Sequence, residues 1–449
     1  MSLITMFPEI LEAGRTEYEE LKAGVFHTSE ETSTEKSDWK NILANGDNGA
    51  FMKALLHDGE FTGKLQMVYI DPPFFSKANY DASVHISQPS GSHEKDFTVK
   101  HRAYGDTWSE GIGQYLSMLA GRLYMIRDLL REDGTVWVHL DWHAVHYVRI
   151  LMDEIFGPEH FVNEIIWTYK SGGSGKKYFA RKHDTILVYS KNKDYYFTPL
   201  KEKSYNRGFK PYHFKGVEEF RDEIGWYTMV NMKDVWQIDM VGRTSAERTG
   251  YATQKPEALL ERILACSTRE GDLCADFFCG SGTLAAAAQK MNRRWICCDQ
   301  SKLAVSTAYR RVLEVRSEAS CGFRLLRQEG MFEDSVSRDT LTLSLQGGKL
   351  RLENCGINLC GLNLDREDLD AVAELSEREP LQLIEYWTAD DAYDGSVHRA
   401  RHVLMRNKGK LQTEINLGPE FSEKEHPTVS VKAADVFGNR YNAVMRDDI

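Results

Sequence analysis

The first stretch that could carry out chemistry is VYIDPPFF, in which Asp71 ends an apolar run and is followed by two prolines and an aromatic ring. A carboxylate and a backbone carbonyl that both accept from the exocyclic amine of a nucleobase would stabilise the positive charge that develops as this nitrogen attacks an activated methyl group. Pro73 supplies no competing donor, and the rings of Pro72 and Pro73 would aim carbonyl and carboxylate the same way. The Phe74 ring could stack on the base. An isolated Asp-Pro-Pro triplet also occurs in ordinary turns, so other motifs are needed to distinguish a catalytic motif from a turn.

A second stretch, ADFFCGSGTLAAAAQKMNRRWICCD, has the pattern of a nucleoside-binding turn. It places Gly280 and Gly282 between an apolar run and an alanine-rich segment, and Asp299 ends the next apolar run. Glycines let the backbone approach a cofactor, the following helix directs amide donors at it, and the acid can bind ribose hydroxyls. The spacing from Gly280 to Ala285 also fits a dinucleotide-binding turn, which keeps NAD open as the cofactor. A glycine turn required only for packing is a third interpretation.

Apolar runs and helical patterns alternate from about residue 40 to 315, which predicts an α/β fold with a largely parallel sheet and helices on both faces. These elements would position both motifs. The expected strands are Asn41–Ala44, Met67–Ile70, Thr135–Leu140, Ile186–Tyr189, Leu273–Phe277 and Trp295–Cys298. The expected helices are Ala50–Leu56, Gly113–Leu130, Val145–Phe156, Pro256–Ser267 and Thr283–Met291.

Two polar segments interrupt this alternation. Residues 81–108 are punctuated by Gly and Pro, and a loop of this length is usually either a working loop or disordered. We expect an active-site loop beside the catalytic motif. The second interruption runs from Trp167 to about Gly250. We therefore expect an N-terminal extension at 1–39, a catalytic domain at 40–315 and a strand-rich C-terminal domain at 319–449.

The bulk properties predict a globular protein of two or three domains. The chain has 449 residues, of which 42% are hydrophobic, and a net charge of -11. Acids occupy the part of the N-terminus where a signal peptide needs an apolar stretch, and no apolar run reaches membrane-spanning length, so we expect a cytoplasmic location. The eight cysteines have no C-x-x-C or Cys-His spacing, and they predict neither a metal site nor disulfides.

One basic segment stands out against the negative total. Between Trp167 and Lys215 there are twelve lysines and arginines and only three acids, with tyrosines between them. This mixture suits phosphate contacts and base stacking, although a solvated basic face with aromatic rings turned inward is the alternative. The predicted DNA-binding residues are Lys170, Lys176, Lys177, Arg181, Lys182, Lys201, Lys203 and Arg207.

The DPPF motif that starts at Asp71 and the FxGxG motif that starts at Phe278 together resemble those of amino-methylating DNA methyltransferases that use S-adenosylmethionine. The catalytic motif precedes the cofactor motif, as in the circularly permuted β-class, to which many type III modification subunits belong. The resemblance covers roughly residues 40–315. It implies a circularly permuted, Rossmann-like class I methyltransferase fold with an inserted DNA-recognition segment.

The resemblance also implies roles for individual residues. The GD element before the catalytic strand would place Asp47 near the cofactor adenine, and the TQK run that starts at Thr253 would face the methionine carboxylate. The implied catalytic residues are Asp71, Pro72, Pro73 and Phe74. The implied cofactor-binding residues are Asp47, Thr253, Gln254, Lys255, Asp276, Phe277, Phe278, Gly280, Gly282, Thr283 and Asp299.

The implied reaction is methyl transfer from S-adenosylmethionine to the N6 amine of an adenine extruded from DNA, because Asp71 resembles the adenine-directed members. Ser is commoner at this place in cytosine-N4 enzymes, and that reaction is the nearest alternative. Phe74 replaces a more frequent Tyr, which keeps the stacking ring and removes a hydroxyl. Asp71 in place of Asn and the permuted order disfavour RNA or protein amides. An NAD-dependent oxidoreductase and an inactive DNA-binding protein are alternatives of another class.

The partners implied by the resemblance are macromolecular. Double-stranded DNA would be the substrate, and the part from about residue 195 to 250 corresponds to the segment that the family varies for target choice. Family members are often dimers, and some bind a restriction subunit. A second copy of the chain and a restriction subunit are therefore further expected partners.

Overall fold

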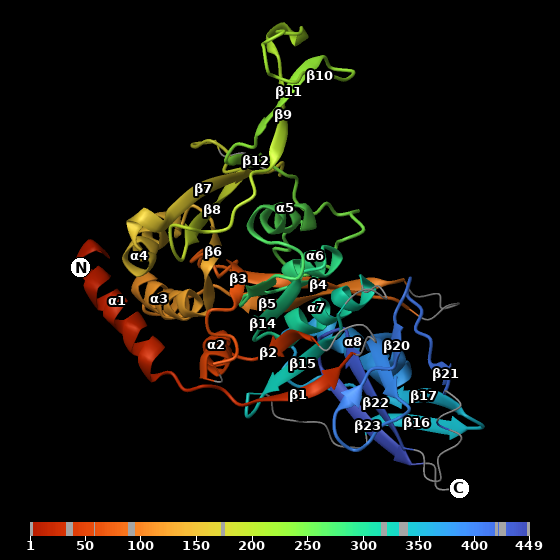
Figure 1. The fold of residues 1–449 in the computed structure, drawn as a ribbon. Helices are drawn as coiled ribbons and strands as arrows, with labels where there is room; N and C mark the ends of the chain where they lie inside the picture. The colour runs from red at the N-terminus through yellow and green to blue at the C-terminus, as the bar shows by residue number, and fades with distance from the viewer. Residues whose placement is uncertain are drawn as a thin grey trace.

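The computed structural model describes residues 3–32, 39–57, 59–88, 95–171, 176–315, 321–331, 340–417, 421 and 428–446. Its centre is an eleven-stranded sheet with helices on both faces (Figure 1). In sheet order the strands are β12 (Val235–Gln237), β7 (Phe161–Thr168), β8 (His183–Ser190), β6 (Leu130–Leu140), β3 (Leu65–Ile70), β13 (Leu273–Asp276), β14 (Arg294–Asp299), β2 (Asn41–Asn45), β15 (Phe323–Gln328), β1 (Phe26–Glu31) and β19 (His398–Arg399).

The middle of this sheet is parallel, from β6 through β3, β13, β14 and β2 to β15. Strand β8 runs antiparallel to both of its neighbours, and β1 runs antiparallel to β15. Every residue of β3 is buried, as expected for a strand covered on both faces. The six strands expected from the sequence are all present, so the predicted α/β fold is confirmed.

Helices cover the two faces separately. On one face, α2 (Asn48–His57), α3 (Ile112–Leu129) and α4 (Val145–Phe156) pack on Val68 and Ile70 of β3, and α1 (Leu3–Glu20) packs on α3. On the other face, α5 (Glu257–Ser267), α6 (Thr283–Lys290) and α7 (Lys302–Glu314) pack on Met67 and Tyr69. Alternate residues of one strand thus serve two cores. The short 3-10 helices are η1 (Pro158–His160), η2 (Arg207–Phe209) and η3 (Pro380–Leu383).

The segment 81–108, which we expected to be a loop, is mainly a β-hairpin. Strands β4 (Asn79–Ile86) and β5 (Phe97–Gly105) pair antiparallel, while residues 89–94 lie outside the described ranges. Buried and exposed residues alternate along β4, which buries Ala82, Val84 and Ile86. The apolar residues Ala82, Val84 and Ile86 recur with a period of two in the sequence, which is the pattern of a half-buried strand, but the polar composition of the segment as a whole led to the prediction of a loop.

The expected recognition segment forms an arm that projects from the body of the molecule (Figure 1). Its strands are β9 (Lys201–Tyr205), β10 (Phe220–Arg221) and β11 (Trp226–Asn231), in the order β10-β11-β9. Neither β9 nor β11 contains a fully buried residue. The arm therefore contributes little to the core, and its inner end returns directly to β12 of the central sheet.

The C-terminal part is rich in strands and lies beside the β1 edge of the central sheet (Figure 1). One sheet contains β20 (His402–Met405), β18 (Ile384–Asp390), β22 (Thr428–Asp435) and β23 (Arg440–Arg446), and another contains β16 (Leu341–Gln346), β17 (Lys349–Cys355) and β21 (Glu414–Asn416). Helix α8 (Arg366–Arg378) precedes β18.

The central sheet also extends beyond residues 40–315, since β1 and β15 both belong to it. The buried carboxylate of Glu30 in β1 joins the sheet to the C-terminal part: it accepts hydrogen bonds from Tyr309, Thr388 and Arg440. The division of the chain into three domains stays a prediction. Among the described residues, no helix combines the length and apolar character needed to cross a membrane.

Candidate functional site

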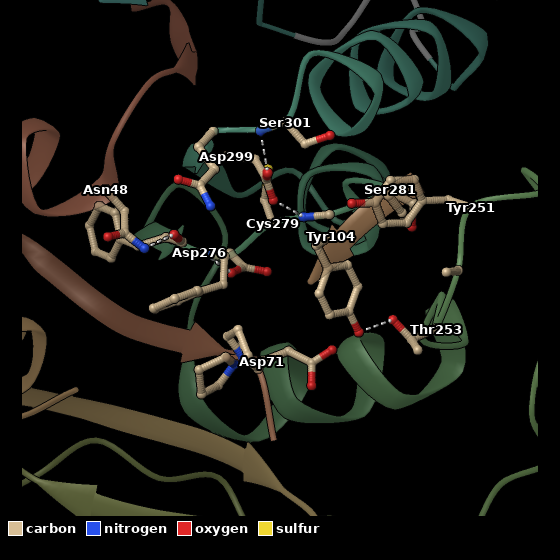
Figure 2. A pocket seen from close by; sticks show the side chains of 18 of the residues that line it. Asn48, Asp71, Tyr104, Tyr251, Thr253, Asp276, Cys279, Ser281, Asp299 and Ser301 are labelled. Carbon is tan, nitrogen blue, oxygen red and sulfur yellow. Dashed lines mark hydrogen bonds between the residues drawn. The ribbon is translucent and has the colours of Figure 1, made fainter. Parts of the chain in front are cut away.

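The two motifs meet at the carboxyl ends of neighbouring parallel strands. Strand β3 pairs with β13 through Met67 and Cys274, so Asp71, directly after β3, lies beside Asp276 at the end of β13. The carboxylates of Asp71, Asp276 and Asp299 face a common space, with Tyr104 and Tyr251 opposite (Figure 2). This space is a cavity of about 540 Å³. Residues more than two hundred positions apart in the chain thus form one site.

Nearly all residues expected for catalysis and cofactor binding line this cavity. They are Asp47, Asp71, Pro72, Pro73, Phe74, Thr253, Gln254, Lys255, Asp276, Phe277, Phe278, Gly280, Thr283 and Asp299. Gly282 does not line it. A Cβ atom at Gly282 would lie 2.7 Å from Cβ of Ala308 in α7, and φ at Gly282 is +74°. Gly282 is thus required by helix packing and a left-handed turn, not by contact with the cavity.

Asp71 is paired with a cation from the cofactor half of the site. The Lys255 ammonium donates to Oδ2 of Asp71, and it also lies 5.2 Å from the centroid of the Phe74 ring. Oδ1 of Asp71 is buried, and it has no hydrogen-bond partner among the described residues. An unpaired buried acceptor is costly, and this one belongs to a residue that lines the cavity. It is available to a donor brought by a ligand.

A buried histidine that was not among the residues predicted from the sequence supports the ring of Phe74. His139 in β6 stacks on Phe74, with ring centroids 5.9 Å apart and an interplanar angle of 22°. Its Nδ1 lies 2.8 Å from the hydroxyl of Tyr69, and its Nε2 lies 3.2 Å from Oδ2 of Asp184. Tyr169 donates to the other oxygen of Asp184 at 3.0 Å. Although burial acts in the opposite direction, the contacts with His139 lower the pKa of Asp184.

This histidine could have been found from the sequence by one signal. It is the polar residue of the apolar run VWVHL, and it comes two places before Asp141. A polar side chain inside a strand that is covered on both faces needs a specific partner. Which partner it has depends on β3 and β8 lying on either side of β6, and local sequence does not contain that information.

The two other acids of the cavity have different surroundings. Burial raises the pKa of Asp276, whose Oδ1 accepts from the N–H of Phe278 at 2.9 Å. Burial also raises the pKa of Asp299, although backbone donors act in the opposite direction. The two oxygens of Asp299 accept from the N–H of Gly280 and of Ser301, each at 2.9 Å. The carboxylate expected to bind ribose hydroxyls therefore also holds the glycine turn in place.

A buried ion network anchors the glycine turn to the helices behind it. Arg311 of α7 donates to Oγ1 of Thr283 at 2.9 Å and to Oε1 of Glu257 at 2.8 Å. Lys290 of α6 pairs with the other oxygen of Glu257. Arg311 is only 4% exposed, and its removal would leave a buried carboxylate with one partner fewer. This network connects α5, α6 and α7.

The remaining predicted cofactor residues are held by local contacts. Asp47 accepts from the N–H of Ala50 at 2.8 Å and thereby caps α2, while its Oδ2 lies 3.6 Å from Arg122. Thr253 has φ of +55°, and its hydroxyl lies 3.1 Å from that of Tyr104 in the hairpin. The hairpin of β4 and β5 therefore forms one wall of the cavity. From the sequence we expected this segment only as a loop near the catalytic motif.

The predicted DNA-binding residues lie outside the cavity. Lys170, Lys176, Lys177, Arg181 and Lys182 belong to the segment between β7 and β8, of which residues 172–175 lie outside the described ranges. The others are on the arm or at its base, where Lys201 donates to Asn231, Lys203 pairs with Asp222, and Arg207 begins η2. The structure thus separates the basic residues into two groups.

The chemical nature of the cavity fits S-adenosylmethionine. Apolar and aromatic side chains such as Phe277, Phe278 and Tyr251 offer faces for an adenine ring, and Asp299 and Asp47 offer acceptors. The Lys255 ammonium is a cation suited to a carboxylate. Among the described residues, no group of three or more His, Cys, Asp or Glu side chains could hold a metal ion.

A family model described as DNA methylase matches residues 65–310, which include both motifs and the strands that carry them. The chain belongs to this DNA methylase family. S-adenosylmethionine, the cofactor expected from the sequence, is the methyl donor of the family. Of the two cofactors that the glycine turn left open, S-adenosylmethionine and NAD, membership thus selects S-adenosylmethionine.

The chain is also similar to individual proteins. The chain is 29% identical over 331 residues to the type II methyltransferase M.EcaI of Enterobacter cloacae, covering 60% of this chain and 69% of that protein. It is 26% identical over 174 residues to the type III restriction-modification enzyme EcoP15I Mod subunit of Escherichia coli, covering 36% of this chain and 26% of that subunit. The crystal structure of an M1.HpyAVI-SAM complex aligns with a TM-score of 0.39 at 16% identity, over 60% of this chain and 98% of that one.

Proposed function

We propose that this DNA methylase transfers a methyl group from S-adenosylmethionine to the N6 amine of an adenine in double-stranded DNA. The observation that carries the proposal is that Asp71 and the Gly280 turn face one cavity. When bound, S-adenosylmethionine supplies a methyl group activated by a sulfonium. What this chain must add is a place for the base, an acceptor for its amine and the exclusion of water.

Asp71 would be the acceptor for the amine. The lone pair of an exocyclic amine is conjugated with the ring, so the nitrogen is a poor nucleophile until acceptors draw it towards a tetrahedral geometry. Oδ1 of Asp71 has no partner among the described residues and can accept one amine hydrogen, and the backbone carbonyl of the motif can accept the other. Lys255 compensates the charge of the carboxylate through Oδ2. The surplus proton leaves after transfer, so Asp71 need not be a strong base.

Phe74 would hold the face of the base. One face of its ring is covered by His139, and the Lys255 ammonium lies 5.2 Å from its centroid. A nucleobase would stack on the part of the ring that lines the cavity. A base inside a duplex cannot reach this cavity, so the target nucleotide must leave the stack. The basic residues between β7 and β8 and those on the arm would bind the phosphates on either side. We assign the catalytic and DNA-binding roles to these residues on this reasoning.

The choice of adenine depends on Asp71, because the resemblance associates Asp at this place with adenine-directed enzymes. The decisive experiment uses labelled S-adenosylmethionine and mixed DNA, followed by digestion to nucleosides. Label in N6-methyladenine is the expected result. Label in N4-methylcytosine would give the base assignment to cytosine while leaving the reaction class intact, and no label in DNA would overturn the proposal.

The residue roles have their own test in Asp71→Ala. Loss of the acceptor should reduce methyl transfer at least about 100-fold, a typical effect of removing a group that stabilises developing charge. Binding of S-adenosylmethionine should remain within a few-fold of wild type, because Asp299 and the glycine turn are unchanged. If the variant methylates DNA as fast as wild type, Asp71 is not the acceptor.

Partners beyond DNA are also part of the proposal. One relative is named as the Mod subunit of a type III enzyme. A restriction subunit and a second copy of this chain are therefore the protein partners to test. Size-exclusion chromatography with light scattering, with and without DNA, would report the second copy.

A further inference from the structure

An unusual group of exposed aromatic side chains lies at the catalytic edge of the sheet. Trp142 is 44% exposed, Tyr178 is 60% exposed and Phe179 is 98% exposed. The guanidinium of Arg181 lies between two of them, 3.8 Å from the ring centroid of Trp142 and 4.8 Å from that of Tyr178. We call Trp142, Tyr178, Phe179 and Arg181 the edge cluster. The reaction described above uses none of its rings.

Topology places the edge cluster beside the catalytic motif. Ile70 of β3 pairs with Val138 of β6, so both strands end at the same edge, and Trp142 follows the end of β6. Strand β8 is antiparallel to β6 and begins at this edge, where Leu140 pairs with Thr185. The residues just before β8 therefore lie beside the residues just after β6. The contact between Arg181 and Trp142 is the direct result.

The parts of the edge cluster differ in how firmly they are held. Arg181 is stacked between two rings, and such cation–π contacts fix a side chain that would otherwise be mobile. Trp142 is further in contact with His143, whose Nδ1 lies 2.6 Å from Oδ2 of Asp141. Phe179, between Tyr178 and Arg181 in the chain, has almost its entire side chain in solvent. The result is a fixed cationic platform with one free phenyl ring.

The chemistry of this arrangement matches an opened DNA duplex. Extrusion of a nucleotide leaves a flat, apolar gap in the base stack, bordered by negatively charged phosphates. Apolar wedges fill such gaps in proteins that unstack DNA, and aromatic rings stack on any base because every base has a π-face. Lys176, Lys177 and Lys182 surround the edge cluster in the chain and add positive charge. The exposed phenyl ring of Phe179 can fill the apolar gap, and the cationic platform can face the phosphates that border it.

We propose that Phe179 enters the DNA stack in place of the extruded nucleotide, and that Trp142, Tyr178 and Arg181 form the platform that holds it there. This inference rests on the proposed function, because it concerns the same extrusion step. It assigns a positioning role to residues that touch neither the transferred methyl group nor the target amine. The partner it requires is double-stranded DNA.

The test compares three variants on duplexes that carry the methylation site, located beforehand by sequencing DNA methylated by the wild-type enzyme. Phe179→Ala and Trp142→Ala remove the wedge and part of its platform. Phe197→Ala is the matched control: Phe197 is also exposed, at 42%, but it lies at the opposite edge, where the neighbouring Tyr196 N–H donates to the carbonyl of Asp133. Each variant is measured for transfer rate at saturating S-adenosylmethionine on a paired duplex and on one that lacks the base opposite the target.

On the paired duplex, Phe179→Ala should be slower by roughly tenfold, which is within the range for loss of one base–aromatic stack. On the duplex with the missing base the difference should shrink to about twofold, since extrusion there breaks no base pair. Phe197→Ala should match wild type on both. Thermal shift measures the binding of S-adenosylmethionine. This binding should be equal in all variants, which would show that they are folded.

The outcomes separate the wedge from the proposed function. If wild type transfers no methyl group to any DNA, the proposed function fails. If wild type is active and Phe179→Ala equals it on the paired duplex, the wedge is overturned. A loss of rate that is equally large on both duplexes would also overturn it, because the residue would then act in simple DNA binding and not in extrusion.

Discussion

At the scale of single residues, the site depends on side chains whose partners come from other strands. Asp71 and Phe74 belong to one short motif, but Lys255 supplies the cation for the first and His139 supplies the stacking partner for the second. His139 in turn is fixed by Tyr69 and Asp184. The position of the catalytic motif therefore depends on the buried hydrogen bonds that fix His139 against Phe74.

Substitution of His139 separates stacking from hydrogen bonding. His139→Phe keeps a ring against Phe74 but leaves the Tyr69 hydroxyl without its partner and Asp184 with Tyr169 alone. We expect it to lower the free energy of unfolding by about 2–4 kcal/mol, since each lost buried contact costs about 1–3 kcal/mol, and to keep methyl transfer within about tenfold of wild type. His139→Ala also removes the ring and should transfer roughly tenfold more slowly than His139→Phe.

Urea unfolding and single-turnover methyl transfer measure these two effects. S-adenosylmethionine binding is the control, because His139 does not line the cavity. Equal transfer rates for the two variants would show that the stacking contact has no role in placing Phe74.

At the scale of elements, the turn from Gly280 to Gly282 must line the cavity and also allow α6 and α7 to pack closely. Gly280 lines the cavity, while Gly282, two residues later, lets α6 start close to α7. The ion network of Glu257, Arg311 and Lys290 then holds α5, α6 and α7 in register behind this turn. The position of the cavity is thus set by three helices: α5 and α6 contribute Leu260 and Thr283 to its lining, and α7 follows the lining residue Ser301.

Gly282→Ala tests this dependence. The new Cβ would lie 2.7 Å from Cβ and 2.9 Å from Cα of Ala308, and φ is +74°, so the helices must move apart. We expect a loss of about 2–4 kcal/mol of stability from overpacking and the left-handed backbone. Affinity for S-adenosylmethionine should fall at least about tenfold, as measured by calorimetry.

Gly271→Ala is the matched control for that variant. Gly271 also has a positive φ, +80°, but a Cβ there meets nothing within 4 Å. It should lose only about 1–2 kcal/mol, the cost of the left-handed backbone alone, and bind S-adenosylmethionine normally. Equal effects of the two substitutions would contradict a role for the contact between α6 and α7.

At the scale of the whole molecule, three parts are joined with different firmness. The C-terminal sheets are attached through a buried polar cluster around Glu30, His398 and Arg440. The arm, in contrast, leaves the body as a ribbon with no fully buried residue in β9 or β11. This contrast predicts that the C-terminal part contributes to stability and that the arm contributes to DNA recognition.

The arm can be removed as a unit. Lys201 pairs with Asn231, and the Met232 N–H donates to the carbonyl of Leu200 at 2.8 Å, so its two ends are adjacent. Replacing 202–230 by an Asn-Gly turn should leave thermal unfolding and S-adenosylmethionine binding nearly unchanged. Methylation at the target site should fall at least about tenfold relative to wild type, in sequencing of methylated DNA. An unchanged target pattern would place recognition elsewhere.

The polar cluster at the C-terminal junction should make stability depend on pH. Burial lowers the pKa of His398 from an ordinary 6.5 to about 4. Its two ring nitrogens lie 2.9 Å from the hydroxyls of Thr388 and Ser430. The unfolded chain takes up a proton on this residue at a higher pH than the folded chain does. Stability is therefore fully present above pH 6.5 and is lost as pH falls towards 4, by up to about 3 kcal/mol.

His398→Gln keeps a polar side chain without a titrating ring. The difference in unfolding free energy between wild type and this variant, measured in urea at pH 7.5 and pH 4.5, isolates the contribution of His398 from that of other groups. We expect the variant to lose less stability on acidification than wild type does. An equal loss in both proteins would show that His398 is not the group that responds.

The sequence by itself determined the α/β alternation, because the period of apolar residues is local information. It also determined the two motifs, since DPPF and FxGxG are contiguous and their chemistry depends on residue type. Of the predicted cofactor residues, only Gly282 lies outside the cavity lining, and the reason is its packing against α7.

The tertiary structure decided which residues that are far apart in the chain become neighbours in the site. The pairing of β3 with β13 brings Asp71 to the glycine turn, and the position of β6 brings His139 beneath Phe74. The antiparallel pairing of β6 with β8 places the residues after β6 beside those before β8 and so creates the edge cluster. Pairing of strands that are far apart in the chain is selected by the burial of both sheet faces at once. That energy belongs to the assembled sheet, so no short stretch of residues specifies it.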